Sequence, residues 1–262
     1  MGRILRDLER HGLAEDTIVV ATSDHVAAPY AGNIRKATLG LIRELENLGH
    51  YASGIYRGYK FTVYEGGLRV PFAVRWPGTV EAGTRCDRLM GLNDLAATLA
   101  EIAGASLKPD QAPDSVSFLP LLRTPAAAGT RRSLVMQSPL AFALRHECWK
   151  LALTPGSGSR GLWGTRPVPE EAWTGALREF GSKPTHQDLR EAPFVQLYDL
   201  GADARETRNL AADRGDVVAE PNGILDRIVR SGRSTPGPAL PNDVDSVDLH
   251  RKARQWLGAE GQ

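Results

Sequence analysis

The hydrophobic pattern at the start of the chain predicts a helix followed by a buried strand. Near the N-terminus, Ile4, Leu5 and Leu8 share one face of a helix, and Gly12 is a natural stop just past its end. Residues 17–22 then form a nearly continuous β-branched and apolar run, which is typical of a strand buried on both faces in a parallel sheet. A helix, a glycine and a buried strand make up the second half of a βαβ unit. We therefore expect this region to be the trailing part of a larger α/β domain.

Two more elements are expected in the region that follows. Residues 35–48 carry leucine and isoleucine at helical spacing, which predicts a helix. Residues 70–76 predict a strand, and Pro71 favours an edge position because proline donates no hydrogen bond to a neighbouring strand. The dipeptide Pro77-Gly78 closes this strand as a turn.

A further helix is predicted over residues 93–103. Asn93 or Asp94 can cap its start, and Gly104 ends it. The apolar stripe of this helix consists of Leu95, Leu99 and Ile102.

The C-terminal half of the chain predicts an antiparallel sheet. Residues 124–130 form a linker of Pro, Ala and Gly, and the apolar segments 142–145 and 149–153 then flank a short turn, which predicts a hairpin. Residues 195–200 predict a third strand, and residues 224–228 suggest a terminal helix.

The fold class that follows is α/β, divided into three regions. Residues 1–124 form an incomplete α/β layer, and residues 131–231 form a small α+β domain with an antiparallel sheet. Residues 232–262 are polar and rich in proline, so we expect a mobile tail. Within the small domain, residues 155–190 are rich in Gly, Pro and charge, which predicts a long excursion over the surface.

Composition excludes several classes of partner. Of the 262 residues, 42% are hydrophobic and 24% are charged, as in ordinary soluble globular proteins. The formal net charge of +1 gives no reason to expect a nucleic acid or a membrane as a partner. No apolar run approaches the roughly 20 residues of a membrane span, and the first residues lack the apolar core of a signal peptide.

Candidate metal chemistry lies where the first strand ends. Ligands of open α/β sheets bind beyond the carboxyl ends of the strands, and Asp24 and His25 stand at that end. An aspartate supplies a hard oxygen for a divalent cation, and a neighbouring histidine can add a nitrogen ligand or a hydrogen bond to an anion. The alternative from the same residues is that Asp24 caps the following loop and His25 is a half-buried polar residue.

Lys60 and His50 are candidate contacts to an anion. Lys60 follows Gly58 in a short loop, and its ammonium can neutralise an anionic ester group as a compact point charge. His50, in the preceding loop, can reach the same cavity. Alternatively, both are ordinary surface residues.

A structural role is favoured for the segment that follows Lys60. Gly66 and Gly67 allow a positive φ angle or a close approach of two backbone segments. Glu65 and Arg69 can pair with each other or hold the loop in place.

Six motifs follow one another in an order that resembles the C-terminal half of the sulfatases, the arylsulfatase-like branch of the alkaline-phosphatase superfamily. They are SDH, GHYASGIYRGYKFTVYEGGLRVPFAVRWPG, LNDLAATLAEIAGA, PDSVSFLPLLR, ALRHECWKLAL and LYDLGADARETRNLA. The resemblance covers the chain from its first residue to about residue 210. Its most specific parts are the lysine loop with YEGGLRVP and the segment that begins LYDL.

This resemblance implies a fold, a reaction and a set of site residues. Residues 1–124 would be the C-terminal part of an alkaline-phosphatase-like catalytic domain, in a sulfuric ester hydrolase whose formylglycine attacks sulfur beside one Ca²⁺. Asp24 matches the metal-binding aspartate of the family, and His25 stands where most members have Asn and some have His. Lys60 matches the lysine that contacts the sulfate group, and His50 matches a histidine that often precedes that loop. The substrate would be a small-molecule or carbohydrate sulfate ester, and the location periplasmic or secreted.

The sequence also departs from the family pattern. The nucleophile motif C/S-x-P/A-x-R does not occur, because neither Cys86 nor Cys148 has it, and the paired aspartates that complete the calcium site are missing. Val26 stands where the family usually has Gly. We therefore expect a fragment that binds Ca²⁺ weakly at most and shows no turnover alone, with the missing N-terminal half as a possible partner.

Two alternatives stay open. The first is a phosphate or phosphonate ester hydrolase of the same superfamily, although His146, His186 and His250 are poorly placed to supply the further metal ligands that it needs. The second is a non-catalytic binding module, in which Trp163 and Trp173 contact carbohydrate or form a local packing cluster.

Overall fold

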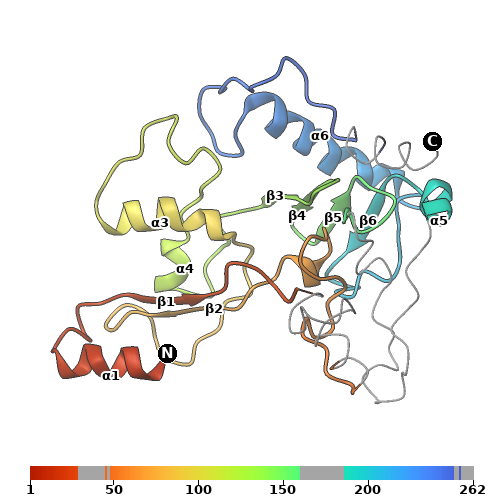
Figure 1. The fold of residues 1–262 in the computed structure, drawn as a ribbon. Helices are drawn as coiled ribbons and strands as arrows, with labels where there is room; N and C mark the ends of the chain where they lie inside the picture. The colour runs from red at the N-terminus through yellow and green to blue at the C-terminus, as the bar shows by residue number, and fades with distance from the viewer. Residues whose placement is uncertain (29–44, 46–47, 160–185, 251–253, 255–262) are drawn as a thin grey trace. The chain divides into compact units, whose positions relative to one another are not determined.

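The structure is a computed structural model, and it describes residues 1–28, 45, 48–159, 186–250 and 254 (Figure 1). The chain divides into two compact units, and it passes between them several times. Unit 1 consists of Met1–Asp24, Val70–Arg132 and Arg233–Leu240, and unit 2 consists of His25–Arg69, Ser133–Gly232 and Pro241–Gln262. The domain limits and the mobile tail expected from the sequence stay predictions.

Unit 1 contains the predicted first helix and first strand. Helix α1 (Gly2–Arg10) ends just before Gly12, whose φ of +68° marks the stop. Strand β1 (Val19–Thr22) pairs with β2 (Phe72–Arg75), and Pro71 directly precedes β2. Within the described residues β1 pairs only with β2, and the pairing is antiparallel. The parallel neighbour was expected from a strand that the βαβ pattern of this chain lacks, so it stays a prediction. The apolar run correctly predicted a strand, but it did not indicate whether a partner strand would pair in the parallel or the antiparallel direction.

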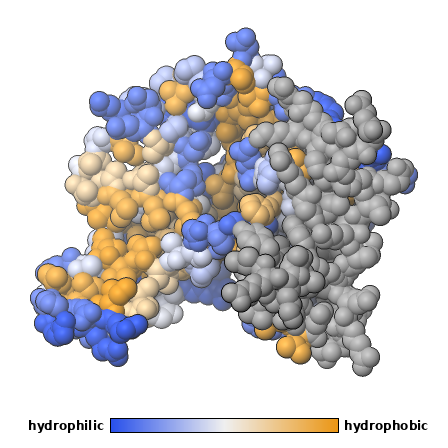
Figure 2. Space-filling view, in the orientation of Figure 1, coloured by the Kyte–Doolittle hydropathy of each residue, from blue (hydrophilic) through white to orange (hydrophobic). Residues whose placement is uncertain are grey.

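The apolar face of α1 is not buried. No residue of α1 is buried, and Ile4 is 58% exposed. In Figure 2, hydrophobic residues reach the surface in the part of unit 1 that contains α1, β1 and β2. The helical spacing of apolar residues therefore predicted the helix, but the described residues cover that face only in part, since Leu5 and Leu8 are half-buried.

The predicted helix over residues 93–103 occurs as η2 (Leu92–Asp94) followed by α3 (Leu95–Ile102). The expected apolar stripe was wrong at Leu99, which is 48% exposed, whereas Asp94 and Thr98 are buried. Asp94 is buried because its carboxylate forms an ion pair with Arg131, whose guanidinium is also buried. The short helix α4 (Leu119–Arg123) completes this part of unit 1. Phe118, just before it, packs edge-on against Phe72 of β2, with 5.8 Å between the ring centroids.

Unit 2 is built on an antiparallel sheet in the order β3-β4-β5-β6. The predicted hairpin is confirmed as β4 (Phe142–His146) and β5 (Trp149–Ala152), and the predicted third strand is confirmed as β6 (Gln196–Asp199). Strand β3 (Ser133–Gln137) pairs with β4 and was not predicted.

Alternate residues of the sheet contact different partners. Leu144 and Leu151 face each other across β4 and β5 and pack with Leu225 of helix α6 (Gly215–Ser231), which lies along the sheet in Figure 1. Ala143 and Ala152, which also face each other, pack instead with the loop that contains the candidate lysine. The two-residue period of a strand therefore assigns one face to α6 and the other to that loop.

Helix α6 is longer than the sequence suggested. Pro221 and Gly223 argue against a helix, which limited the expectation to residues 224–228. The helix nevertheless begins at Gly215, because apolar residues at helical spacing pack on the sheet and outweigh the poor local propensity; these residues are Val218, Ile224, Leu225, Ile228 and Val229.

The segment after β5 corrects another expectation. Residues 155–159 were expected on the surface, yet all five are buried. Ser157 accepts a hydrogen bond at its carbonyl from Val63, at 2.9 Å, and Gly158 accepts one from Leu140, at 3.1 Å. The segment returns over the sheet and satisfies its backbone groups there. A short helix, α5 (His186–Glu191), precedes β6. Of the helix predicted over residues 35–48 the structure describes only residues 45 and 48, and the two tryptophans of the long excursion lie outside the described residues.

Candidate active site

Lys60 lies in a tight turn with unusual backbone geometry. The N–H of Thr62 donates to the carbonyl of Tyr59 at 3.0 Å, which places Lys60 and Phe61 at the centre of the turn. Phe61 has a φ of +79°, a value that type II turns require at this position and that glycine normally supplies. Such backbone strain persists only where the surrounding structure determines the conformation, and it is frequent at functional sites. Lys60 itself is half-buried.

The same turn is tied to the segment that follows β1. The backbone N–H of Lys60 donates to the carbonyl of Ala27 at 3.0 Å. Asp24 and His25 precede Ala27 and are both exposed; Asp24 is the last residue of unit 1 and His25 the first of unit 2. The ring nitrogen Nδ1 of His25 lies 2.8 Å from the carbonyl oxygen of Val26 and donates a hydrogen bond to it. The structure therefore brings the backbone of Lys60 close to Ala27, two residues after His25.

His50 lies in an exposed turn, in which its backbone N–H donates to the carbonyl of Leu45 at 2.8 Å. Its predicted contribution to an anion site stays a prediction.

Gly66 is required for close backbone approach. Both glycines of the EGG segment lie in η1 (Glu65–Gly67) without a positive φ, so close approach explains them. A Cβ atom added at Gly66 would lie 2.6 Å from the carbonyl oxygens of Tyr56, Arg57 and Gly58. The lysine loop therefore passes over Gly66 and bonds to it, with the Gly66 N–H donating to the carbonyl of Arg57 at 2.7 Å.

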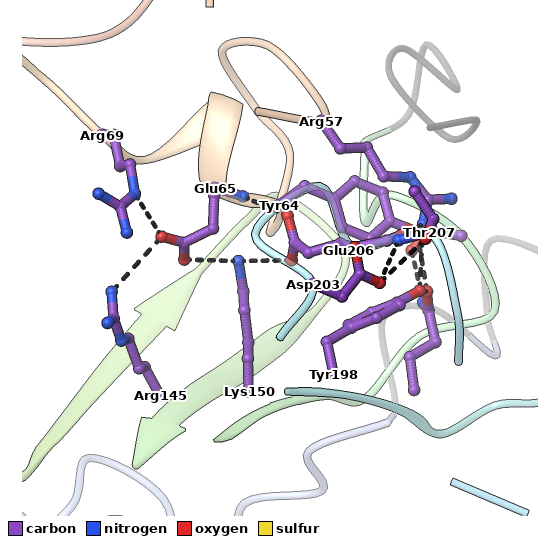
Figure 3. Close-up of polar contacts among 12 residues, drawn as sticks. Arg57, Tyr64, Glu65, Arg69, Arg145, Lys150, Tyr198, Asp203, Glu206 and Thr207 are labelled. Atoms are coloured by element: carbon purple, nitrogen blue, oxygen red, sulfur yellow. Dashed lines mark hydrogen bonds and ion pairs between the residues drawn. The ribbon is translucent and has the colours of Figure 1, made fainter. Parts of the chain in front are cut away.

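Glu65 is the centre of a buried ionic network, shown in Figure 3. Its carboxylate binds Lys150 of β5 at 3.1 Å, Arg69 at 2.6 Å and Arg145 of β4 at 3.5 Å. Burial by itself would raise the pKa of Glu65, but the attraction of Lys150, Arg69 and Arg145 is stronger and lowers it to about 2. The predicted pairing of Glu65 with Arg69 is confirmed.

Glu206 is the second carboxylate of this network. One oxygen accepts the backbone N–H of Glu65 at 2.7 Å, and the other lies 2.9 Å from the ammonium of Lys150. The side chain is fully buried, and the backbone φ of +55° is rare for a residue with a side chain. Burial raises the pKa of Glu206; Lys150 opposes this shift, and the charge of Glu65 adds to it. Lys150 is therefore a buried cation shared by two carboxylates.

A buried aromatic group adjoins the network. The guanidinium of Arg57 lies 3.8 Å above the ring of Tyr64 and donates to the hydroxyl of Tyr198 at 3.1 Å. Both tyrosine hydroxyls donate to the side-chain carbonyl of Gln196, at 2.8 and 2.6 Å. These contacts connect the start of the lysine loop to β6.

The lowered pKa of Glu65 leads to a pH prediction. A carboxyl whose pKa falls from 4.5 to about 2 on folding stabilises the protein above pH 4.5, and this contribution disappears as the pH falls towards 2. The shift corresponds to about 3 kcal/mol. We expect the difference in unfolding free energy between the wild type and Glu65→Gln to be largest at neutral pH and to shrink on acidification.

Urea unfolding of both proteins between about pH 7 and about pH 2.5 would measure this difference. Glu206 acts in the opposite sense, because a raised pKa favours the folded state on protonation, so the Glu206→Gln variant is the control. A difference between wild type and Glu65→Gln that stays constant over the whole range would contradict the prediction.

Sequence reasoning missed Lys150 and Glu206. A weak signal was present for Lys150, which stands between Trp149 and Leu151 in an otherwise apolar strand. A buried charge in such a run needs a partner of opposite sign. The sequence, however, did not indicate which carboxylate that partner would be.

The described residues do not by themselves make up a metal site. Among them no three His, Cys, Asp or Glu side chains come together. Ca²⁺ takes about six to eight oxygen ligands, and Asp24 and His25 supply at most a small part of such a shell. Nδ1 of His146 forms a hydrogen bond with the hydroxyl of Ser133 at 2.7 Å. The ring of His250 packs edge-on against the ring of Phe194, with 5.4 Å between the ring centroids, so both histidines have other contacts. In the part of the chain that the structure describes, no helix is long and apolar enough to cross a membrane.

Solved structures define the class of fold. A structure from Bacteroides thetaiotaomicron, described in work on the metabolism of multiple glycosaminoglycans, matches with a TM-score of 0.65 and 30% identity over 87% of this chain and 42% of the other. A sulfatase from Pseudoalteromonas sp. matches with a TM-score of 0.60 and 18% identity, over 87% and 40% of the two chains. The predicted fold class, α/β and alkaline-phosphatase-like with a small antiparallel-sheet domain, is confirmed.

Sequence comparison gives the family. The family model Sulfatase matches residues 1–105. The N-acetylgalactosamine-6-O-sulfatase of Bacteroides thetaiotaomicron is 30% identical over 231 residues, which are 87% of this chain and 39% of the relative. The steryl-sulfatase of Mus musculus is 29% identical over 267 residues, which cover 98% of this chain and 38% of the relative. The chain is therefore similar to sulfatases over most of its length, and it spans about two fifths of the length of these curated relatives.

Proposed function

We propose that this chain is the sulfate-binding part of a sulfuric ester hydrolase and that Lys60 contacts the sulfate group. One observation carries the proposal. The half-buried Lys60 stands on a strained turn, while the loop around it is held by a buried ionic network. A protein that maintains such a turn places a positive charge at a defined point, as binding of an anionic ester requires.

The chemistry of sulfate ester hydrolysis suits this arrangement. Negative charge builds up on the ester oxygens as the S–O bond breaks, and a fixed ammonium stabilises that charge. One of the two curated relatives is named as a sulfatase of the sugar N-acetylgalactosamine, and the other as a steryl-sulfatase. The proposed substrate class for this chain is accordingly a small-molecule or carbohydrate sulfate ester.

Asp24 and His25 are the proposed contribution of this chain to a calcium site. Asp24 and His25 are both exposed just after the end of β1, and their side chains are of the types that supply an oxygen and a nitrogen ligand to a metal. A bound Ca²⁺ would supply further positive charge for the ester oxygens. Because these two residues form only a partial ligand set, we propose that another polypeptide segment supplies the remaining calcium ligands. The N-terminal half of a sulfatase is the proposed partner.

Sulfate binding at Lys60 is the direct test of this function. The chain would be treated with a limiting amount of an amine-acylating reagent, with and without sodium sulfate, and modification of each lysine would be measured by mass spectrometry. We expect sulfate to slow the acylation of Lys60 several-fold, because an ammonium that contacts an anion is less available as a free amine.

Two controls accompany this measurement. The exposed Lys108 should be acylated at the same rate in both conditions, and sodium chloride of equal ionic strength should not protect Lys60. Equal acylation of Lys60 with and without sulfate would overturn the proposed function.

A further inference from the structure

Both ends of the lysine loop are attached to one distant residue. At the start of the loop, Arg57 donates to the backbone carbonyl of Glu206 at 2.8 Å. At the end of the loop, the backbone N–H of Glu65 donates to the carboxylate of Glu206 at 2.7 Å. Glu206 lies 141 positions after Glu65 in the sequence, and Lys60 lies between the two attachment points.

Lys150 makes this attachment rigid. Its ammonium lies 3.1 Å from the Glu65 carboxylate and 2.9 Å from the Glu206 carboxylate, and its side chain is fully buried. Because Lys150 belongs to β5, the central hairpin of unit 2 holds both carboxylates in place. Glu206 in turn adopts a left-handed backbone conformation that only surrounding contacts can maintain.

We propose that Glu206 is a positioning residue for Lys60, acting through the two ends of residues 57–65 with Lys150 as the bridge. The inference rests on the proposed function, in which Lys60 holds the sulfate group. Glu206 does not act on the sulfate itself. It holds the loop in the conformation in which the Lys60 turn closes with Phe61 at positive φ.

The variant Glu206→Gln isolates this role. A carboxylate accepts from both Lys150 and the Glu65 N–H, whereas the amide of glutamine offers one oxygen and one NH₂ group. One of the two donors therefore loses its acceptor, although the side chain keeps its size. The matched control is Glu147→Gln, because Glu147 also has a positive φ of +54° but is exposed in the β4–β5 turn.

Hydrogen exchange separates positioning from general stability. In Glu206→Gln we expect the amides of residues 62–68 to exchange about tenfold faster, while the exchange of the amides of β4 and β5 changes much less. The reason is that the loop can open locally without unfolding of the whole protein. We also expect sulfate to protect Lys60 less than in the wild type. The Glu147→Gln variant should leave both readouts unchanged.

The outcomes distinguish the inference from the function on which it rests. If sulfate does not slow the acylation of Lys60 in the wild type, the proposed function is overturned, whatever the exchange pattern. Unchanged or uniformly faster exchange in Glu206→Gln would overturn the positioning role, even if sulfate binds to Lys60. If Glu206→Gln does not fold, Arg57→Lys loosens the other attachment, and the same local increase in exchange is expected.

Discussion

Replacing Lys150 by methionine is expected to lower the free energy of unfolding by about 3 to 5 kcal/mol. The substitution keeps most of the buried volume but removes the cation shared by Glu65 and Glu206. Two carboxylates would then remain buried. Glu206 would lose the cation with which it forms an ion pair among the described residues. An uncompensated buried charge is one of the few causes of a loss this large.

Urea unfolding at neutral pH would measure the loss, with Lys108→Met as the control because Lys108 is exposed. The double variant Lys150→Met/Glu206→Gln should recover part of the stability, because it removes one of the unpaired charges. A single variant as stable as the wild type would show that the network is not a source of stability.

Replacing Gly66 by alanine is expected to be about as damaging, with a loss of about 3 kcal/mol or more. The added Cβ would lie 2.6 Å from three carbonyl oxygens, and all three belong to the backbone. A flexible side chain could move aside, but here the lysine loop itself must move. Sulfate protection of Lys60 should disappear together with the stability.

The helix α6 offers a matched control for this substitution. Gly223 is exposed, and a Cβ at this position meets nothing within 4 Å. Gly223→Ala should raise the free energy of unfolding by about 0.5 to 1 kcal/mol, because alanine is favoured over glycine inside helices. A Gly66→Ala protein with wild-type stability and wild-type exchange in residues 62–68 would contradict the close approach seen in the structure.

Local patterns in the sequence were sufficient for several elements. The helix α1 and its glycine stop, the β4–β5 hairpin and strand β6 all follow from the spacing of apolar residues and from turn residues within about ten positions. The pairing of Glu65 with Arg69 was also accessible, since residues four apart lie close together in a helical turn. Lys60 could be chosen as the candidate anion contact from its loop and from the family resemblance.

Other features depended on partners that are far away in the sequence. The exposure of Leu99 and the burial of residues 155–159 depend on what packs against each segment, and residue spacing does not encode that. The length of α6 was underestimated because Pro221 and Gly223 lower the local propensity, whereas packing on the sheet restores the helix.

The sequence by itself predicted the β4–β5 hairpin and strand β6 of unit 2 and pointed to Lys60 as the candidate for the proposed chemistry, because short-range spacing and motifs carry this information. Only the tertiary structure showed that Glu206 and Lys150 hold the loop around Lys60. The physical reason is that a buried charge needs a partner of opposite sign at about 3 Å, and for Glu65 the fold supplies that partner, Lys150, from a segment 85 positions away in the chain.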